Sequence, residues 1–220
     1  MLPQTEPEGR PRRGRRPADE VRADVLRATA ALLYEEGLRS VTFDRVASKA
    51  RVSKTTIYKW WPTPGALAAE SYFATSKPDL VFHDTGDVRT DIRRQLRAFL
   101  RFTTVQGGGR VIAELIGAAQ TDSNLSAAVS EHYTMPRRRL AVQYFEHARQ
   151  RGQLRHDVDL NLLVDQLWGA CYNRLLIPDA PLNRPFVDAL VHNTLMGAAS
   201  QNYRMELFVS GVDGQDNPPA

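Results

Sequence analysis

Hydrophobic residues recur every three to four positions along most of the chain, and this spacing places them on one face of a helix. The first run starts at Val21, shortly after Asp19, whose carboxylate can cap a helix N-terminus. It ends before Gly37, and glycine is common directly after a helix C-terminus. The pattern therefore predicts a first helix between Asp19 and Gly37.

Two shorter helices follow, separated by a tight turn. Residues 43–50 fit the first of them, with Thr42 as its N-cap. Ser53 can cap the second, which is expected to run from Lys54 to Trp60 or Trp61. Pro64 then suits the first position of a fourth helix, because proline needs no amide hydrogen there.

Beyond residue 78 the chain continues in helical spacing and offers no convincing strand. Proline lacks the amide hydrogen that a helix interior uses, so Pro136 should kink or split the run that contains it. Five further helices are expected, near residues 87–104, 110–120, 124–151, 160–177 and 185–202. We predict an all-α fold, with a three-helix domain over 18–62 and a larger helical domain over 63–210. A basic arm, 1–17, and a tail, 211–220, should be disordered.

Composition agrees with a globular protein that stays out of membranes. Of 220 residues, 42% are hydrophobic and 25% charged, and no apolar stretch approaches the roughly 18 residues of a membrane span. The N-terminus carries charge where a secretory signal needs an apolar centre, so we expect the protein in the cytoplasm. The single cysteine, Cys171, cannot form an internal disulfide and is expected to be a small core residue.

The two short helices have the pattern of a helix-turn-helix. Apolar residues occur only where two crossing helices must touch: Val46, Ala47, Val52, Ile57 and Trp61. Their burial turns the other face of the second helix outward, and a helix-turn-helix offers that face to the major groove. DNA contacts are expected from Thr42, Arg45, Arg51, Ser53, Lys54, Thr55, Thr56, Tyr58, Lys59 and Trp60. On spacing alone, an amphipathic helix pair without a DNA role is the alternative.

Positive charge is concentrated at the same end of the chain. Residues 1–60 hold 13 Lys and Arg against 8 Asp and Glu, whereas the remaining residues hold 16 against 17. This placement favours a polyanionic partner for the first quarter of the chain. The arginines of 12–16 can follow the minor groove of a duplex, or form a solvated tail that adds affinity without reading sequence.

The run TFDRVASKARVSKTTIYKWW, residues 42–61, resembles the DNA-binding module of the TetR family of bacterial regulators, and the resemblance extends over 19–67. Weaker similarity to the effector domain of one branch of that family lies at 151–159 and 187–190. The resemblance implies a homodimeric repressor whose second motif helix enters the groove of a palindromic operator. It also implies a small-molecule pocket in the larger domain and pairing through the last two long helices.

Two positions depart from the family pattern. Arg51 stands in the turn where glycine is usual, so a left-handed backbone there would cost about 1 kcal/mol. Pro64 stands near the place of a common lysine that grips the DNA backbone, so the amides of that helix start or the N-terminal arginines would have to replace it.

A pocket for the effector should lie among the middle helices of the larger domain. Bulky and polar-tipped residues gather there: Phe99, Phe102, Glu114, His132, Tyr133, Trp168 and Tyr172. Each can equally be plain core, and Glu114 is the sharpest candidate because a carboxylate facing an apolar interior needs a partner. The helix over 43–50 and the fourth helix, 64–76, are expected to connect this pocket to the DNA-binding domain.

Stripes of small and apolar residues on the last two helices suit a dimer interface, with intramolecular packing as the alternative. The first stripe holds Leu163, Gln166, Leu167, Ala170 and Cys171, and the second Leu190, Asn193, Thr194, Gly197 and Ala198.

Other signals are discounted. The glycines of 107–109 lack the Lys-Ser/Thr ending of a phosphate-binding loop, and the five histidines never stand four residues apart as a helical zinc site requires. We therefore expect no catalytic residue, metal or cofactor. Two other functions stay open: an all-helical small-molecule-binding protein or enzyme without a DNA role, and an architectural DNA binder without an effector.

Overall fold

The computed structural model describes residues 16–76, 82–177 and 179–205, and most of these are helical. The β pairing found among the described residues is an isolated bridge between Leu154 and Ala199. The all-α prediction is thus confirmed. The helices are α1 (Ala18–Glu36), η1 (Leu38–Ser40), α2 (Phe43–Ala50), α3 (Lys54–Tyr58), α4 (Pro64–Ser76), α5 (Val88–Thr104), α6 (Gly108–Ala119), α7 (Ser123–Val129), η3 (Ser130–Thr134), α8 (Met135–Gln150), α9 (Leu160–Leu176) and α10 (Arg184–Ala198).

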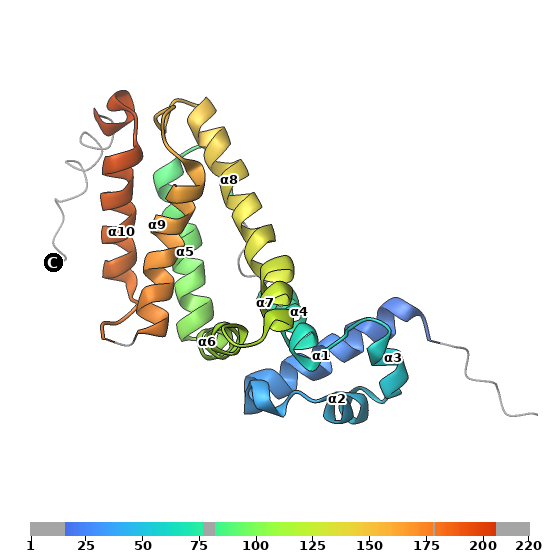
Figure 1. Cartoon of the computed structure of the whole chain (residues 1–220). Coiled ribbons are helices and arrows are strands. Elements are labelled where there is room, and N and C mark those ends of the chain that lie inside the picture. Colours follow the sequence, from blue (N-terminus) through green and yellow to red (C-terminus); the bar gives the residue numbers. More distant parts are fainter. Residues whose placement is uncertain (1–15, 77–81, 178, 206–220) are drawn as a thin grey trace, which may run out of the picture.

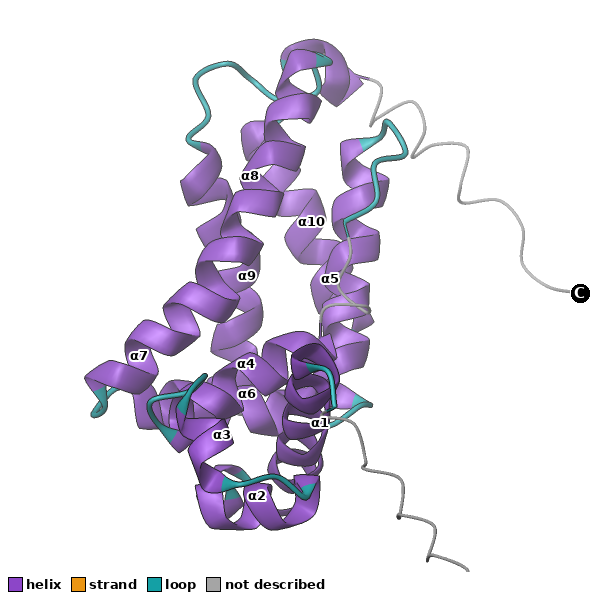
Figure 2. Ribbon diagram, turned by 90° about the vertical axis from the view of Figure 1, so that its right-hand side faces the viewer, coloured by secondary structure: helices purple, strands orange, loops and turns teal. Residues whose placement is uncertain are grey.

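The helices form two groups that share one continuous core. The long helices α5, α8, α9 and α10 stand side by side, while α1, α2 and α3 gather at one end of the molecule (Figure 1, Figure 2). Helix α4 packs against α1 on one side and against α6, α7 and η3 on the other. The basic arm up to residue 15 and the expected tail at 211–220 lie outside the described residues.

Local capping chemistry fixes the first helices. The hydroxyl of Thr42 accepts a hydrogen bond from the Arg45 amide, and that of Ser53 accepts one from the Thr56 amide at 3.2 Å. Both caps were predicted. The prediction that Asp19 caps α1 was wrong. Helix α1 begins at Ala18, after Pro17, with no side-chain cap, and Asp19 lies in the first turn, where its negative charge interacts favourably with the helix dipole.

Three helix boundaries differ from the sequence prediction by two residues or more. Helix α3 stops at Tyr58, because the amides of residues 60 and 61 both turn back to the Ile57 carbonyl. Helix α6 begins at Gly108 rather than Arg110, directly after Gly107, which has the left-handed conformation. A Cβ at Gly108 would lie 2.3 Å from the Phe102 ring, so this position requires a glycine. Helix α10 ends at Ala198, because the next residue turns extended to meet Leu154.

Pro136 acts as predicted, through a specific device. The run splits into α7 and α8 at η3, a π-helical turn over Ser130–Thr134, and Pro136 stands in the first turn of α8. A π turn lets the chain pass the missing proline amide without losing helical direction.

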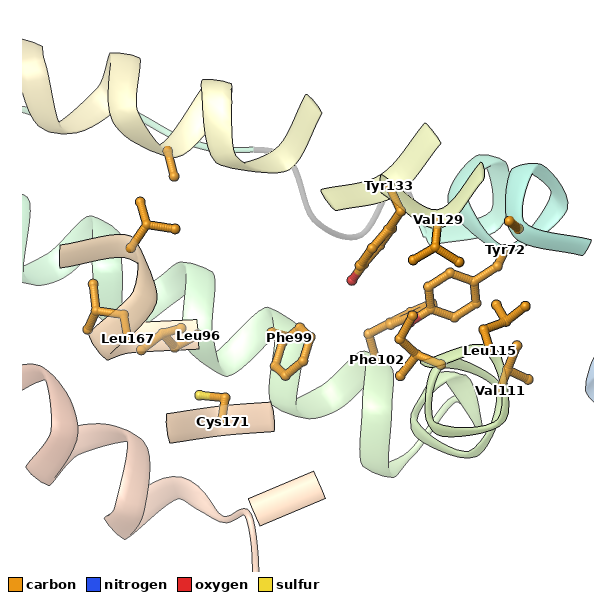
Figure 3. Packing of buried hydrophobic residues seen from close by; sticks show 14 of the residues in the cluster. Tyr72, Leu96, Phe99, Phe102, Val111, Leu115, Val129, Tyr133, Leu167 and Cys171 are labelled. Atoms are coloured by element: carbon orange, nitrogen blue, oxygen red, sulfur yellow. The ribbon is translucent and has the colours of Figure 1, made fainter. Parts of the chain in front are cut away.

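Large aromatic side chains join the two groups of helices. Tyr72 of α4 lies edge-on to Phe102 of α5 at 5.7 Å and to Tyr133 of η3 at 5.2 Å between ring centroids (Figure 3). Cys171 is buried nearby, as expected, and burial raises the pKa of its thiol to about 12. Among the described residues, no helix is both long and apolar enough to cross a membrane.

Candidate nucleic-acid interface and internal cavity

The apolar underside of the α2–turn–α3 unit is sealed as the sequence predicted. Val46 and Ile57 are fully buried, and Trp61 is 1% exposed. The Trp61 indole donates a hydrogen bond to a Glu70 carboxylate oxygen of α4 at 2.7 Å, which fixes the end of the unit against the next helix. Helix α3 is thus held rigidly by one face.

The opposite face of α3 is open to water. Lys54, Thr55, Tyr58 and Lys59 are exposed there, and we call these four residues the reading edge. Tyr58 is 59% exposed although its ring packs edge-on against Phe43 at 4.6 Å. The reading edge combines ammonium groups, a hydroxyl and a phenol, groups that can donate to phosphate oxygens and base edges.

Two of the residues expected on this face are less exposed than the reading edge. Trp60 is half-buried: it packs on the core and lies edge-on to Trp61 at 5.6 Å, because the chain leaves the helix after Tyr58. Thr56 is also half-buried, and its hydroxyl lies 2.9 Å from that of Ser53 within the capping turn. Thr42 and Ser53 serve as caps at the two helix starts.

Arg51 adopts the left-handed conformation that the sequence predicted for the turn. Its φ is 55° and its ψ 46°, and no other non-glycine residue in the described part of the chain has a positive φ. The turn is tied by the Val52 amide, which donates to the Ala47 carbonyl at 3.0 Å. The Arg51 side chain is exposed beside the start of α3.

Acidic side chains hold several of the basic groups of this surface. Lys54 lies 2.8 Å from an Asp44 oxygen, and this partner raises the pKa of the lysine. Arg45 lies 2.6 Å from Glu36 and lowers the pKa of that carboxyl. Lys59 makes no ion pair with the residues described. A phosphate would therefore compete with Asp44 for Lys54 but reach Lys59 directly.

The fourth helix starts as expected, with one difference for DNA binding. Pro64 occupies its first position, and the Thr63 hydroxyl accepts a hydrogen bond from the Ala66 amide at 3.1 Å. One of the amides expected to replace the family's lysine is therefore already capped.

Glu114 does not face an internal pocket, so its predicted position was wrong. Its carboxylate accepts a hydrogen bond from the Leu38 amide at 2.6 Å and pairs with Arg110 at 2.7 Å. Arg110 in turn donates to the Tyr34 carbonyl at 2.6 Å. We call Tyr34, Leu38, Arg110 and Glu114 the α1–α6 clasp. The partner of the Glu114 carboxylate is thus the backbone just after α1. The pattern of neighbouring residues in the sequence does not reveal this contact.

The clasp requires a glycine between its parts. Gly37 has a φ of 89° and a ψ of 176°, a conformation open almost only to glycine. A Cβ at this position would lie 2.9 Å from a Glu114 oxygen. Helix α1 and η1, rather than α2 as expected, therefore connect the helix-turn-helix to α6, alongside α4.

A cavity of about 290 Å³ lies between α5, α6, η3, α8 and α9. Phe99, Tyr133, Trp168 and Tyr172, all named from the sequence, line it. Phe102 does not, because its ring packs on Tyr72. His132 is also absent from the lining and is half-buried on η3.

The cavity holds charged residues that the sequence analysis missed. Arg137 and Arg138 line it from α8, and Asp165 lines it from α9 and pairs with Arg138. The run of three arginines at 137–139 could have indicated this. Successive helix positions point about 100° apart, so three charged residues in a row cannot all lie on the solvent face of a helix.

The proposed dimer stripe on α9 was wrong in part. Leu167 is 0% exposed because it faces the protomer's own core beside Cys171. Leu163 is 1% exposed but still lines a surface groove between α9 and α10. Ala170 is half-buried on the same helix. On α10, Leu190, Thr194 and Gly197 line the same groove with Leu162 and Gln166 of α9. We call these five residues the α9–α10 groove.

Comparisons with known proteins agree with this geometry. Residues 25–70 match the sequence model of the bacterial regulatory proteins of the tetR family, and residues 82–194 that of the tetracyclin repressor-like C-terminal domain. The chain is 38% identical to the uncharacterized HTH-type transcriptional regulator YdeS of Bacillus subtilis, over 83% of this chain and 92% of that protein. It is 32% identical to the DNA-binding transcriptional repressor TetR of Mycobacteroides abscessus, over 80% and 93%. The crystal structure of the TetR family transcription regulator SCO0332 superposes with a TM-score of 0.76 at 56% identity, covering 81% of this chain and 98% of that one.

Proposed function

Because the chain belongs to the TetR family and is a DNA-binding transcriptional regulator, we propose that the reading edge of α3 recognises an operator and that a small molecule in the cavity releases it. The protein then acts as a repressor, as the name of its relative from Mycobacteroides abscessus states for that protein. A regulator of this kind works on the chromosome, so we place it in the cytoplasm.

One observation carries the DNA assignment: α3 is sealed on one side by Ile57 and Trp61 and open on the other at the reading edge. A short rigid helix with donors on its outer edge fits the major groove, where base edges present acceptors. Lys54 and Lys59 supply the phosphate contacts that fix the helix in place.

A dimer places two such helices on one duplex. We propose that two copies pair through the α9–α10 groove, whose lining includes the small residues Gly197 and Thr194, so that the backbones can approach closely. Recognition helices of such dimers bind half-sites about 34–36 Å apart, which makes a palindromic operator the expected target.

Effector control follows from linkage. If the ligand binds better to a dimer whose two α3 helices have the wrong spacing for the operator, it must weaken DNA binding. The factor equals the one by which DNA weakens binding of the ligand. Helix α6 supports this route because Ile112 and Ile116 line the cavity, while Arg110 and Glu114 of the same helix hold the end of α1. We propose that α6 transmits occupancy of the cavity to the DNA-binding helices through the clasp.

The test is a titration of operator DNA, selected beforehand from random duplexes, at several salt concentrations. Lys59→Ala should lower affinity and reduce the slope of log affinity against log salt by roughly 0.9, the value of one lost phosphate contact. Arg139→Ala, which removes an exposed cation from α8, is the matched control and should change neither quantity. Unchanged affinity and slope in both Lys54→Ala and Lys59→Ala would refute the assignment.

A further inference from the structure

The cavity is walled mainly by aromatic and aliphatic side chains. Tyr133 points from η3 toward Phe99 of α5 (Figure 3), and Phe82, Trp168 and Tyr172 also line the space. At about 290 Å³ it stands at the lower end of the roughly 300–1,000 Å³ of small-molecule pockets. Flat rings pack favourably against aromatic side chains. The cavity therefore suits a compact, planar aromatic compound.

The cavity opens to the surface between α8 and α9. Its lining from α5 and α6 is mostly buried, with Phe99 and Ile112 each 1% exposed. The exposed residues of the described lining are Thr134, directly before α8, and Asp165 and Gly169 on α9. We call the opening between these three residues the α8–α9 mouth.

An ion pair spans this mouth. Arg138 of α8 pairs with Asp165 of α9 and donates to the Asn161 carbonyl, one turn earlier on α9, at 3.3 Å. The Arg138 and Asp165 side chains are 29% and 56% exposed, so the pair lies at the outer end of the cavity. An ion pair with this exposure contributes little energy and can open readily. It can therefore cover the mouth without sealing it.

Gly169 stands at the mouth although the fold of the protomer does not require a glycine there. It lies inside α9, where glycine weakens a helix relative to alanine. It is not among the described glycines with a positive φ, so alanine could adopt its backbone conformation. A Cβ built on it meets nothing within 4 Å among the described residues. Gly169 also does not line the α9–α10 groove. The space that it leaves free lies at the entrance of the cavity.

We propose that a planar aromatic effector enters the cavity through the α8–α9 mouth, where Gly169 keeps the passage wide and the Arg138–Asp165 pair closes over the bound molecule. Gly169 then limits how bulky an entering ring system can be. This inference rests on the proposed function, since it concerns the effector of that same cavity.

Stopped-flow fluorescence of the full-length protein without DNA tests the proposal. The probe is N-phenyl-1-naphthylamine, an aromatic amine whose fluorescence rises in apolar surroundings. Gly169→Leu should slow both association and dissociation about tenfold, because the new side chain narrows the passage. The dissociation constant should change less than about threefold, since the bound and free states keep their contacts. Gly117→Leu, at a helix position on α6 that is equally open, is the control and should keep the wild-type rates.

A second variant tests the ion pair. Asp165→Asn should speed both association and dissociation severalfold, because the mouth then opens without breaking a pair. Asp188→Asn, which removes the partner of Arg97 between α5 and α10, is its control and should leave both rates unchanged.

Three results would overturn the proposal. They are no binding of the probe to the wild-type protein, wild-type rates in Gly169→Leu, or a Gly169→Leu protein that loses the dimer while Gly117→Leu keeps it. The last result would assign the glycine to the dimer interface. If Gly169→Leu does not fold, Asp165→Asn decides, and wild-type rates in that variant would refute the proposed entrance.

The proposed function fails separately. A wild-type protein that selects no operator would contradict the proposed function, whereas the rates of probe entry are measured without DNA and would stand. Wild-type rates in Gly169→Leu would contradict this inference alone and leave operator recognition in place.

Discussion

At residue scale, Arg51 shows how the turn of the helix-turn-helix restricts the backbone. The chain must reverse between α2 and α3 in three residues, and the left-handed conformation at Arg51 achieves this. Its Cβ makes that conformation costly by about 1–2 kcal/mol. The exposed guanidinium lies where phosphates are expected, so a cation here adds charge to the interface at some loss of stability.

Replacing Arg51 should therefore change stability according to how well the new residue tolerates φ above zero. Arg51→Asn should stabilise the protein by about 0.5 kcal/mol, since asparagine enters the left-handed region more readily. Arg51→Val should destabilise it by about 1–2 kcal/mol, because a β-branched residue strains there. Urea unfolding of the purified variants measures both. Equal midpoints for the two variants would show that the turn carries no such strain.

Asp44 limits the reading edge, because it holds Lys54 at 2.8 Å and places a negative charge beside the expected phosphates. Asp44→Asn should raise operator affinity severalfold, since it frees Lys54 and removes repulsion. Fluorescence anisotropy with labelled operator measures the change, and Glu131→Gln, an exposed site on η3, is the control. An affinity that falls would instead indicate that Asp44 itself contacts the DNA.

At element scale, helices that are far apart in the sequence are joined by a few polar contacts. The clasp ties α6 to the end of α1 through a carboxylate that serves both a backbone amide and an arginine. Such a charge-assisted contact is stronger than a neutral hydrogen bond, and its removal leaves the Leu38 amide without an acceptor.

Glu114→Ala should consequently loosen the junction. We expect a loss of about 1–2 kcal/mol in unfolding free energy and faster hydrogen exchange at the Leu38 amide. Gly37→Ala should have a similar effect, since its Cβ would push on the same carboxylate. Glu131→Ala is the control and should exchange as the wild type does. Unchanged protection of Leu38 in Glu114→Ala would disprove the role of the clasp.

Features that depend on neighbouring residues could be predicted from the sequence, whereas features that depend on contacts between distant helices could not. Thr42 and Ser53 cap their helices as expected because a cap depends on neighbours within a few residues. The outward edge of α3 was predictable for the same reason. The environments of Glu114 and Leu167 were not, because they depend on how α6 and α9 rotate against distant helices. Arg137 was overlooked since arginine is usually exposed.

At the scale of the whole molecule, the proposed operator binding depends on two copies acting together. Gly197 lies in the α9–α10 groove, and a Cβ built on it meets nothing within 4 Å among the described residues of the same protomer. Larger residues are therefore tolerated by the isolated fold and are also better helix formers than glycine. A substitution at Gly197 can therefore disturb the interface without destabilising the protomer.

Gly197→Arg should give a folded monomer with weakened operator binding, because a bulky cation at the centre of the groove would keep the copies apart. Analytical ultracentrifugation and circular dichroism measure the two properties. Gly117→Arg, at a site on α6 that is equally open within the protomer, should remain dimeric. A dimer that persists in Gly197→Arg would move the interface to another surface.

The most direct measurement is selection of bound duplexes from a random pool by the wild-type protein and by a Thr55→Ala, Tyr58→Ala variant. The account predicts a palindrome with half-site centres about one helical turn apart for the wild type. For the variant it predicts loss or change of the motif at the base pairs that α3 reads. A wild-type pool without a motif, or the same motif from both proteins, would contradict the claim that the exposed edge of α3 recognises DNA.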